Sequence, residues 1–228
     1  MGTVRLGVLG GTFNPIHLGH LHIARSVRRL FSLSEVHFVV AAAPPHKPMG
    51  ALIPLMHRYA MVCLATAGEP SFLPSLVELE PPASSFSVDT LRKLSRQVAH
   101  NRGILYFIAG GDSLLEVKSW RESERLLTAY NFIFVARPGT GTADLREVLP
   151  RKAVSRVRDF TGLGIAQIRR RIAEESAAEN RIYIVDVGAP DISATQIRNR
   201  VRSGKPVHRA VPPPVRAYIH KFHLYGGR

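Results

Sequence analysis

The sequence predicts an α/β protein built on a Rossmann-like, doubly wound parallel sheet, with C-terminal helices packed on it. Apolar runs typical of buried strands alternate with amphipathic helical segments along the whole chain. Unusual residues cluster after the expected strands, where sheets of this type bind their ligands. The chain of 228 residues has no internal repeat and no clear linker. We therefore expect a single domain over residues 1–228, with a C-terminal helical part at about 193–224.

The expected elements follow from the spacing of apolar residues, because short apolar runs indicate strands and a spacing of three to four residues indicates helices. The expected strands are residues 3–9, 36–42, 72–79 (the weakest, since Pro74 interrupts it), 104–109, 132–136 and 181–187. The expected helices are residues 18–31, 54–67, 88–100 after an N-cap at Ser87, about 116–130 in one piece or two, 165–178, 194–203 after an N-cap at Ser193, and 212–222. Residues 140–164 are basic, and we expect them to be irregular.

The composition narrows the class of function. No apolar run approaches the ~20 residues that cross a bilayer, and the first residues are typical of a strand rather than of a secretion signal, so we expect a cytoplasmic protein. The single cysteine, Cys63, excludes an internal disulfide and is expected to be a buried structural thiol. The net charge of +14 favours anionic partners. Phosphorylated substrates are the preferred partners; nucleic acid stays open but less favoured, because no aromatic-rich strand accompanies the basic residues.

The stretch from Gly10 to His20 is expected to bind phosphate. Its sequence, Gly-Gly-Thr-Phe-Asn-Pro-Ile-His-Leu-Gly-His, lies between the first strand and the first helix. Glycines at such a turn allow backbone N–H groups to approach an anion. His17 and His20 are three residues apart at the helix entrance, so both can face one site. A packing role for His20 and a metal site for the pair are the alternatives, but zinc is poorly supported without a nearby cysteine or carboxylate.

The same stretch resembles the signature of the nucleotidyltransferase superfamily, which carries a His-x-Gly-His or closely related element. Further motifs follow in the order seen in bacterial nicotinate-nucleotide adenylyltransferases: Pro44–Lys47, Ser87–Leu91, Gly110–Leu114, Trp120, Ala136–Gly139, Ile192–Arg198 and Val211–Ile219. The resemblance spans almost the whole chain. It fails at residues 78–87, which lack the arginine, glycine, tyrosine and threonine that the family often has there. We expect this loop to be stiffer than the family's loop, because it contains Pro81 and Pro82.

The resemblance implies that AMP is transferred from ATP to nicotinate mononucleotide, giving nicotinate adenine dinucleotide and pyrophosphate in NAD biosynthesis. It also implies Mg²⁺ bound with ATP and no metal ligand supplied directly by the protein. The nucleophile would be a phosphate oxygen that is already anionic at neutral pH, so alignment and charge neutralisation matter more than a strong base. Nicotinamide mononucleotide is the nearest alternative acceptor, and pantetheine phosphate is a more distant one.

The resemblance also implies the site residues. Those implied to bind ATP are Gly10, Gly11, Thr12, Phe13, His17, His20, Asp112, Ser193, Thr195 and Arg198, of which His17, His20 and Arg198 are catalytic. Those implied to bind nicotinate mononucleotide are Asn14, Lys47, Ser87 and Trp120. Ordinary roles remain as alternatives: a core residue for Trp120, helix N-caps for Asp112 and Ser193, and a solvated loop residue for Lys47. A homo-oligomer also stays open.

Overall fold

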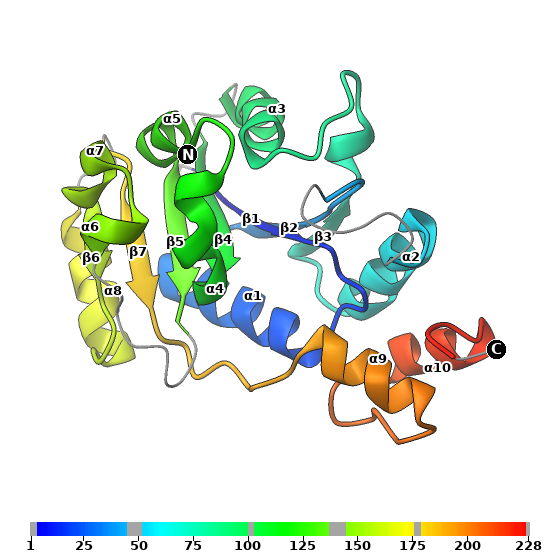
Figure 1. Ribbon diagram of the computed structural model, residues 1–228. Helices are drawn as coiled ribbons and strands as arrows, with labels where there is room; N and C mark the ends of the chain where they lie inside the picture. Colours follow the sequence, from blue (N-terminus) through cyan, green and yellow to red (C-terminus); the bar gives the residue numbers. More distant parts are fainter. Residues whose placement is uncertain (1–3, 45–51, 100–102, 137–144, 176–178, 227–228) are drawn as a thin grey trace.

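A seven-stranded parallel sheet forms the centre of the computed structural model, which describes residues 4–44, 52–99, 103–136, 145–175 and 179–226 (Figure 1). The strand order is β3-β2-β1-β4-β5-β7-β6, and every adjacent pair is parallel. The strands are β1 (Arg5–Gly11), β2 (Glu35–Val40), β3 (Phe72–Ser75), β4 (Ile104–Gly110), β5 (Asn131–Val135), β6 (Val157–Asp159) and β7 (Ile182–Val185). The predicted doubly wound parallel sheet is confirmed.

Helices cover both faces of this sheet. One face carries α1 (Leu18–Phe31), α2 (Leu55–Thr66), α8 (Ile165–Glu174), α9 (Ala194–Arg202) and α10 (Pro213–Lys221). The other face carries α3 (Ser87–Ala99), α4 (Gly111–Glu116), α5 (Ser123–Ala129), α6 (Leu145–Val148) and α7 (Arg151–Val154), with the short 3₁₀ helices η1 (Val77–Leu79) and η2 (Val117–Ser119). No helix in the described part of the chain is long and apolar enough to cross a membrane.

The strands are apolar on both sides because each face of the sheet is buried. Val8 and Leu9 are consecutive and both buried, and they belong to the cores on opposite faces of the sheet. Phe107 and Ile108 of the neighbouring β4 divide in the same way. Each large apolar side chain buried in this way contributes roughly 1.5–3 kcal/mol.

Helix α1 has the bounds that the sequence predicts. Its buried positions recur at helical spacing and face the sheet; they are Gly19, Leu21, Ala24, Val27, Leu30 and Phe31. Arg28 and Arg29 lie in the last turn, where positive charge suits the negative end of the helix dipole. Ser32 ends the helix in the left-handed conformation, with φ of +52°.

The chain reverses its direction of winding between β1 and β4. From β1 the chain builds β2 and then β3 on one side, and afterwards returns to place β4 on the other side of β1. In an open parallel sheet this reversal leaves a crevice at the carboxyl ends of the two strands, which is where ligands bind. The crevice lies next to Gly11 of β1 and Gly110 of β4.

Several local expectations are wrong. Residues 145–159 are not irregular, because they form α6, α7 and the edge strand β6; elements of three or four residues are too short to produce a periodic pattern. The segment expected at about 116–130, as one helix or two, is divided, but its first helix begins earlier, at Gly111 directly after β4, and α5 begins at Ser123. Glu122 interrupts the segment with a left-handed φ of +53°.

Three smaller corrections concern residues 63–87. Cys63 is half-buried rather than buried. The third strand ends at Ser75, and residues 77–79 form η1. Ser87 is the first residue of α3 rather than its cap, because the carbonyl of Phe86 already accepts hydrogen bonds from the N–H groups of Asp89 and Thr90. The helix therefore starts one residue earlier than the hydroxyl of Ser87 suggests.

The C-terminal segment returns to the entrance of α1. The N–H of Leu18 donates to the carbonyl of Ala210 at 2.8 Å. The hydroxyl of Tyr225 donates to Oδ1 of Asn14 at 2.9 Å, and both side chains are buried. Burial raises the pKa of Tyr225, so its hydroxyl stays protonated and remains a donor at neutral pH. These contacts connect the C-terminal segment to the turn between β1 and α1.

Candidate active site

The turn between β1 and α1 is tight and held in a strained conformation. Gly10 and Gly11 are the last two residues of β1, so the turn begins at Thr12 and not at the glycines, as the sequence suggested. Phe13 is buried and has φ of +46°, a left-handed conformation that is unusual for a bulky residue and is typical of functional turns. A Cβ on Gly11 would lie 3.1 Å from the Phe13 ring. Glycine at position 11 therefore gives that ring its space.

His17 and His20 form a stacked pair at the start of α1. Their ring centroids are 3.6 Å apart with an interplanar angle of 26°, and the backbone N–H of His17 donates to Nδ1 of His20 at 3.2 Å. The edge contact of Phe13 with His20, at 5.1 Å between centroids, supports one side of the pair. On the other side, a Cβ on Gly19 would lie 3.0 Å from Nδ1 of His17. The two rings therefore lie together, and neighbouring residues fix their positions; that both face a bound phosphate stays a prediction.

The N-terminus of α9 lies beside the same turn. The Oγ of Ser193 accepts a hydrogen bond from the N–H of Thr195 at 3.2 Å, so Ser193 is the expected N-cap. Arg198 donates from Nη1 to the carbonyl of Asn14 at 2.9 Å and from Nη2 to Oγ1 of Thr195 at 3.0 Å. The first turns of α1 and α9 contain no acidic residue. Two helix N-termini and a guanidinium thus provide positive potential at one place.

A cavity of about 420 Å³ opens at the carboxyl ends of β1, β2 and β4. Gly10 and Gly11 line it from β1, Ser87 lines it from the start of α3, and Trp120 lines it from the end of η2. The Trp120 ring also packs edge-on against Phe107, at 5.9 Å between centroids, and against the core beneath. Trp120 therefore packs on the core and also lines the cavity, while stacking of a ligand ring on it stays a prediction.

Three expected site residues, Asp112, Asn14 and Lys47, are not found lining this cavity among the described residues. Asp112 is the second residue of α4, directly after β4, and its side chain is exposed. Asn14 is buried against Tyr225 and is not among the described residues that line the cavity. Lys47 lies outside the described residues, as do residues 137–139 of the Ala136–Gly139 motif. The roles expected of these residues stay predictions.

Sequence reasoning missed Arg58, which is 2% exposed and connects two of the site's loops. Its Nη1 donates to the carbonyls of Thr12 at 2.8 Å and Ala41 at 2.7 Å. Longer hydrogen bonds join its Nε to Ile53 and its Nη2 to Ala42. Desolvation by burial lowers the pKa of this guanidinium. The only sequence signal was a single arginine within the otherwise uncharged stretch of α2.

Glu78 is a second buried charge that the sequence did not single out. Its Oε2 accepts from the N–H of Ala42 at 2.9 Å, and its Oε1 accepts from the hydroxyl of Thr90 at 3.4 Å. Burial raises the pKa of Glu78, although the N–H of Ala42 and the neighbouring hydroxyls oppose that rise. Ala42 is therefore held at its carbonyl by Arg58 and at its N–H by Glu78. This fixes the end of β2, from which the chain continues toward Lys47.

Metal ligands do not gather in this site. Among the residues that the structure describes, no group of three or more His, Cys, Asp or Glu side chains could hold a metal ion. The carboxylates that line the cavity are Glu78 and Glu116. The arrangement can bind polyanions through N–H groups, imidazoles and a guanidinium, and it can hold a flat ring against Trp120.

Comparisons with known proteins agree with this geometry. The cytidylyltransferase-like family model matches residues 8–200. A Geobacter metallireducens protein named “Probable nicotinate-nucleotide adenylyltransferase” is 41% identical over 226 residues, covering 97% of this chain and 98% of the relative. A Thermoanaerobacter relative of the same name is 36% identical and covers 97% of this chain and 94% of its own length.

A solved structure supports the fold. The nicotinic acid mononucleotide adenylyltransferase of Plasmodium falciparum, complexed with NaAD, superposes with a TM-score of 0.70 at 18% identity and covers 97% of each chain. The sheet, the histidine-bearing turn and the family model together define a nucleotidyltransferase. The chain belongs to the cytidylyltransferase-like family, in the branch of the nicotinate-nucleotide adenylyltransferases.

Proposed function

We propose that this enzyme transfers AMP from ATP to nicotinate mononucleotide and releases pyrophosphate, a step of NAD biosynthesis. One observation carries the proposal. The cavity at the crevice between β1 and β4 lies directly beside a turn that presents two helix N-termini, a stacked histidine pair and Arg198. The cavity suits a flat nucleotide ring, and the turn beside it suits a triphosphate. The full-length similarity to relatives named for this reaction supports the same acceptor.

The triphosphate of ATP would bind at the turn between β1 and α1. Backbone groups of Gly11, Thr12 and Phe13 would contact it. His17 and His20 would contact the α-phosphate during transfer. Because the two ring centroids lie 3.6 Å apart, both rings would contact the same phosphate group. A single electrostatic donor of this kind typically contributes about 3 kcal/mol to the transition state.

The leaving pyrophosphate would be held by the start of α9. Ser193 and Thr195 place their N–H groups and hydroxyls there, and Arg198 adds positive charge. Contacts with Asn14 and Thr195 already orient the Arg198 guanidinium, so little side-chain freedom is lost when it binds a phosphate. Neutralising the leaving group lowers the barrier for breaking the bond between the α- and β-phosphates.

The acceptor would occupy the 420 Å³ cavity. The nicotinate ring would stack on Trp120 near Ser87, and Lys47 would reach the phosphate of the mononucleotide. Asn14 would act indirectly, since its side chain faces Tyr225 and its carbonyl holds Arg198. The phosphate of the acceptor needs no strong base, because it is already anionic. The protein's task is to align two polyanions for in-line attack.

Mg²⁺ would accompany ATP and neutralise charge on its phosphates. The residues present fit this mode of binding, because Mg²⁺ usually keeps several waters and takes one or two carboxylates plus phosphate oxygens. The exposed Asp112, after β4, would order it through water or hold a ribose hydroxyl. We place this reaction in the cytoplasm and in a single domain spanning the chain.

The deciding experiment compares acceptors. Purified enzyme with ATP and Mg²⁺ is offered nicotinate mononucleotide, nicotinamide mononucleotide or pantetheine phosphate, and pyrophosphate release is followed. We expect the highest kcat/KM with nicotinate mononucleotide. If that acceptor releases no pyrophosphate, the proposal is wrong. Salt-sensitive binding to DNA or RNA without turnover would instead support the nucleic-acid alternative that the net charge of +14 leaves open.

A further inference from the structure

Arg121 has an unusual position in the proposed acceptor site. Three charged side chains line the 420 Å³ cavity among the described residues: Glu78, Glu116 and Arg121. The two glutamates would repel an anionic group, and only Arg121 would attract one. Building on the proposed function, we propose that the Arg121 side chain selects the acceptor by binding the carboxylate of the nicotinate ring, so that the amide is disfavoured.

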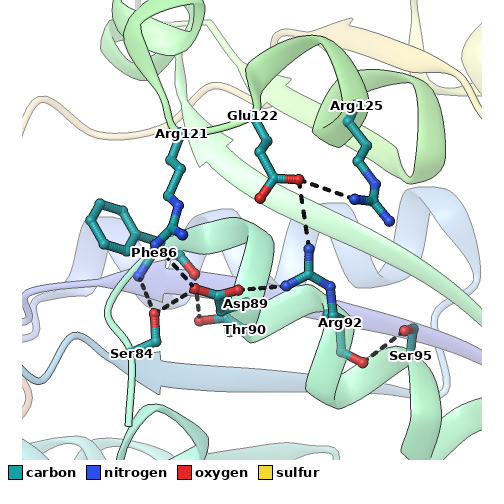
Figure 2. Close-up of polar contacts among 9 residues, drawn as sticks. All are labelled: Ser84, Phe86, Asp89, Thr90, Arg92, Ser95, Arg121, Glu122 and Arg125. Atoms are coloured by element: carbon teal, nitrogen blue, oxygen red, sulfur yellow. Dashed lines mark hydrogen bonds and ion pairs between the residues drawn. The ribbon is translucent and has the colours of Figure 1, made fainter. Parts of the chain in front are cut away.

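Arg121 is adjacent in sequence to the residue expected to stack on the ring. It follows Trp120, and both residues line the same cavity. Its guanidinium carbon lies 4.9 Å from the centroid of the Phe86 ring, in a cation–π contact. Phe86 in turn precedes Ser87 and also lines the cavity. Figure 2 shows the Arg121 side chain reaching from its own segment to the Phe86 ring and toward Asp89 of α3. A ring substituent beside Trp120 and Ser87 would thus be near this guanidinium.

The surrounding ion pairs leave Arg121 available. Its Nη1 is 3.8 Å from Oδ2 of Asp89, but that carboxylate already pairs with Arg92 at 2.6 Å and accepts from the Ser84 hydroxyl at 2.7 Å. Glu122 lies 3.6 Å from Arg92 and 3.3 Å from Arg125. In this network, which Figure 2 shows, three arginines share two carboxylates. One positive charge is in excess, and Arg121 makes the longest of these ion pairs.

The loop at residues 78–87, which departs from the family motif, lies at the same site as Arg121. Residues Pro82 to Phe86 and Arg121 line a second, larger cavity of about 870 Å³, which shares its boundary residues Glu78, Ser85, Phe86 and Arg121 with the first. The Arg121 side chain is 55% exposed, so a ligand can reach it. The loop that departs from the family motif therefore supplies Phe86, the ring against which this guanidinium lies.

Nicotinate and nicotinamide have the same shape, so charge and hydrogen bonding must separate them. A guanidinium can donate two parallel hydrogen bonds to a carboxylate. The guanidinium can donate to the single oxygen of an amide, but the amide NH₂ group would then face an N–H donor of the guanidinium. A site built around a specific hydrogen-bonding group can reject an isosteric analogue strongly. Because Arg121 is half-exposed and solvent weakens its electric field, we expect the acid to be preferred over the amide by tens of fold rather than thousands.

The test uses a feature of the chain: Trp120 is its only tryptophan. Quenching of its fluorescence by nicotinate mononucleotide and by nicotinamide mononucleotide measures binding beside Arg121 without turnover. The variants are Arg121→Gln, Arg121→Lys and, as the matched control, Arg125→Gln. Arg125 belongs to the same ion-pair network but does not line the cavity. The ratio of kcat/KM for the two acceptors is measured on the same proteins.

We expect Arg121→Gln to lower the preference for nicotinate over nicotinamide mononucleotide about 30-fold, in binding and in kcat/KM, because the variant binds the nicotinate compound more weakly. Arg121→Lys should keep part of it, and Arg125→Gln should keep all of it. An unchanged ratio in Arg121→Gln, or an equal loss with both acceptors, would overturn the inference, since a structural role affects both alike. If wild type turns over neither mononucleotide, the proposed function fails; the binding ratios would still judge Arg121.

Discussion

Replacing Arg58 with methionine should destabilise the protein strongly, although Arg58 lies outside the proposed substrate contacts. The side chain is 2% exposed, and its two shortest hydrogen bonds, 2.7 and 2.8 Å long, satisfy the carbonyls of Ala41 and Thr12. A hydrogen bond to a charged group contributes about 1.5–3 kcal/mol, and a buried acceptor left without a donor costs a similar amount. The methionine variant no longer has to bury a charged guanidinium, and this gain offsets part of the loss. We expect a net loss of about 3–4 kcal/mol.

The assay is thermal unfolding followed by circular dichroism. For a chain of this size, 1 kcal/mol shifts Tm by about 2–4 °C, so Arg58→Met should lower Tm by roughly 6–15 °C. Arg25→Met is the matched control, because Arg25 pairs with Glu69 at the surface, with 41% and 35% of the side chains exposed, and such pairs contribute at most about 1 kcal/mol. If Arg58→Met lowers Tm no further than Arg25→Met does, the account of Arg58 as the link between the two loops is refuted.

Three further predictions concern catalysis, acceptor binding and pH. His20→Ala should lower kcat about 100-fold in the pyrophosphate assay, and a value within threefold of wild type would remove His20 from the mechanism. Trp120→Ala should mainly raise KM for the mononucleotide, and an unchanged KM would contradict stacking. Burial raises the pKa of Glu78 above its ordinary value of 4.5, so its contribution to stability is greatest below pH 4.5 and falls as pH rises through the raised pKa. The Tm of Glu78→Gln relative to wild type should therefore rise between about pH 4.5 and 7, and a flat difference would count against that pKa shift.

The sequence predicts much of the fold because long elements carry a clear period. Residues 18–31 are a helix with the predicted bounds, and the strands from β1 to β5 and β7 fall within a few residues of their apolar runs. The elements that the sequence does not predict correctly are short or interrupted. No pattern reveals β6, which has three residues at the sheet edge. The sequence allows the helical segment after β4 to be in two pieces, but local signals do not show that the break lies at Glu122, in a left-handed conformation.

The candidate site could be predicted where the residues lie on one continuous stretch. The proximity of His17 and His20 follows from their spacing at a helix start, and the Ser193 cap follows from its place before an amphipathic helix. Arg58 and Glu78 could not be found in this way, because their importance comes from the loops that folding brings to them. Arg121 gave no signal either. Its place over Phe86 depends on how η2 and the start of α3 meet in space.

The most direct test of the account follows the α-phosphorus of ATP. Purified enzyme, Mg²⁺ and nicotinate mononucleotide are incubated with ATP labelled at the α-phosphate and, in a parallel reaction, at the γ-phosphate. The account predicts α-label in nicotinate adenine dinucleotide and γ-label in pyrophosphate, with both products lost when the metal is removed by a chelator. Label from the γ-phosphate in the nicotinate product, or no labelled dinucleotide at all, would contradict it.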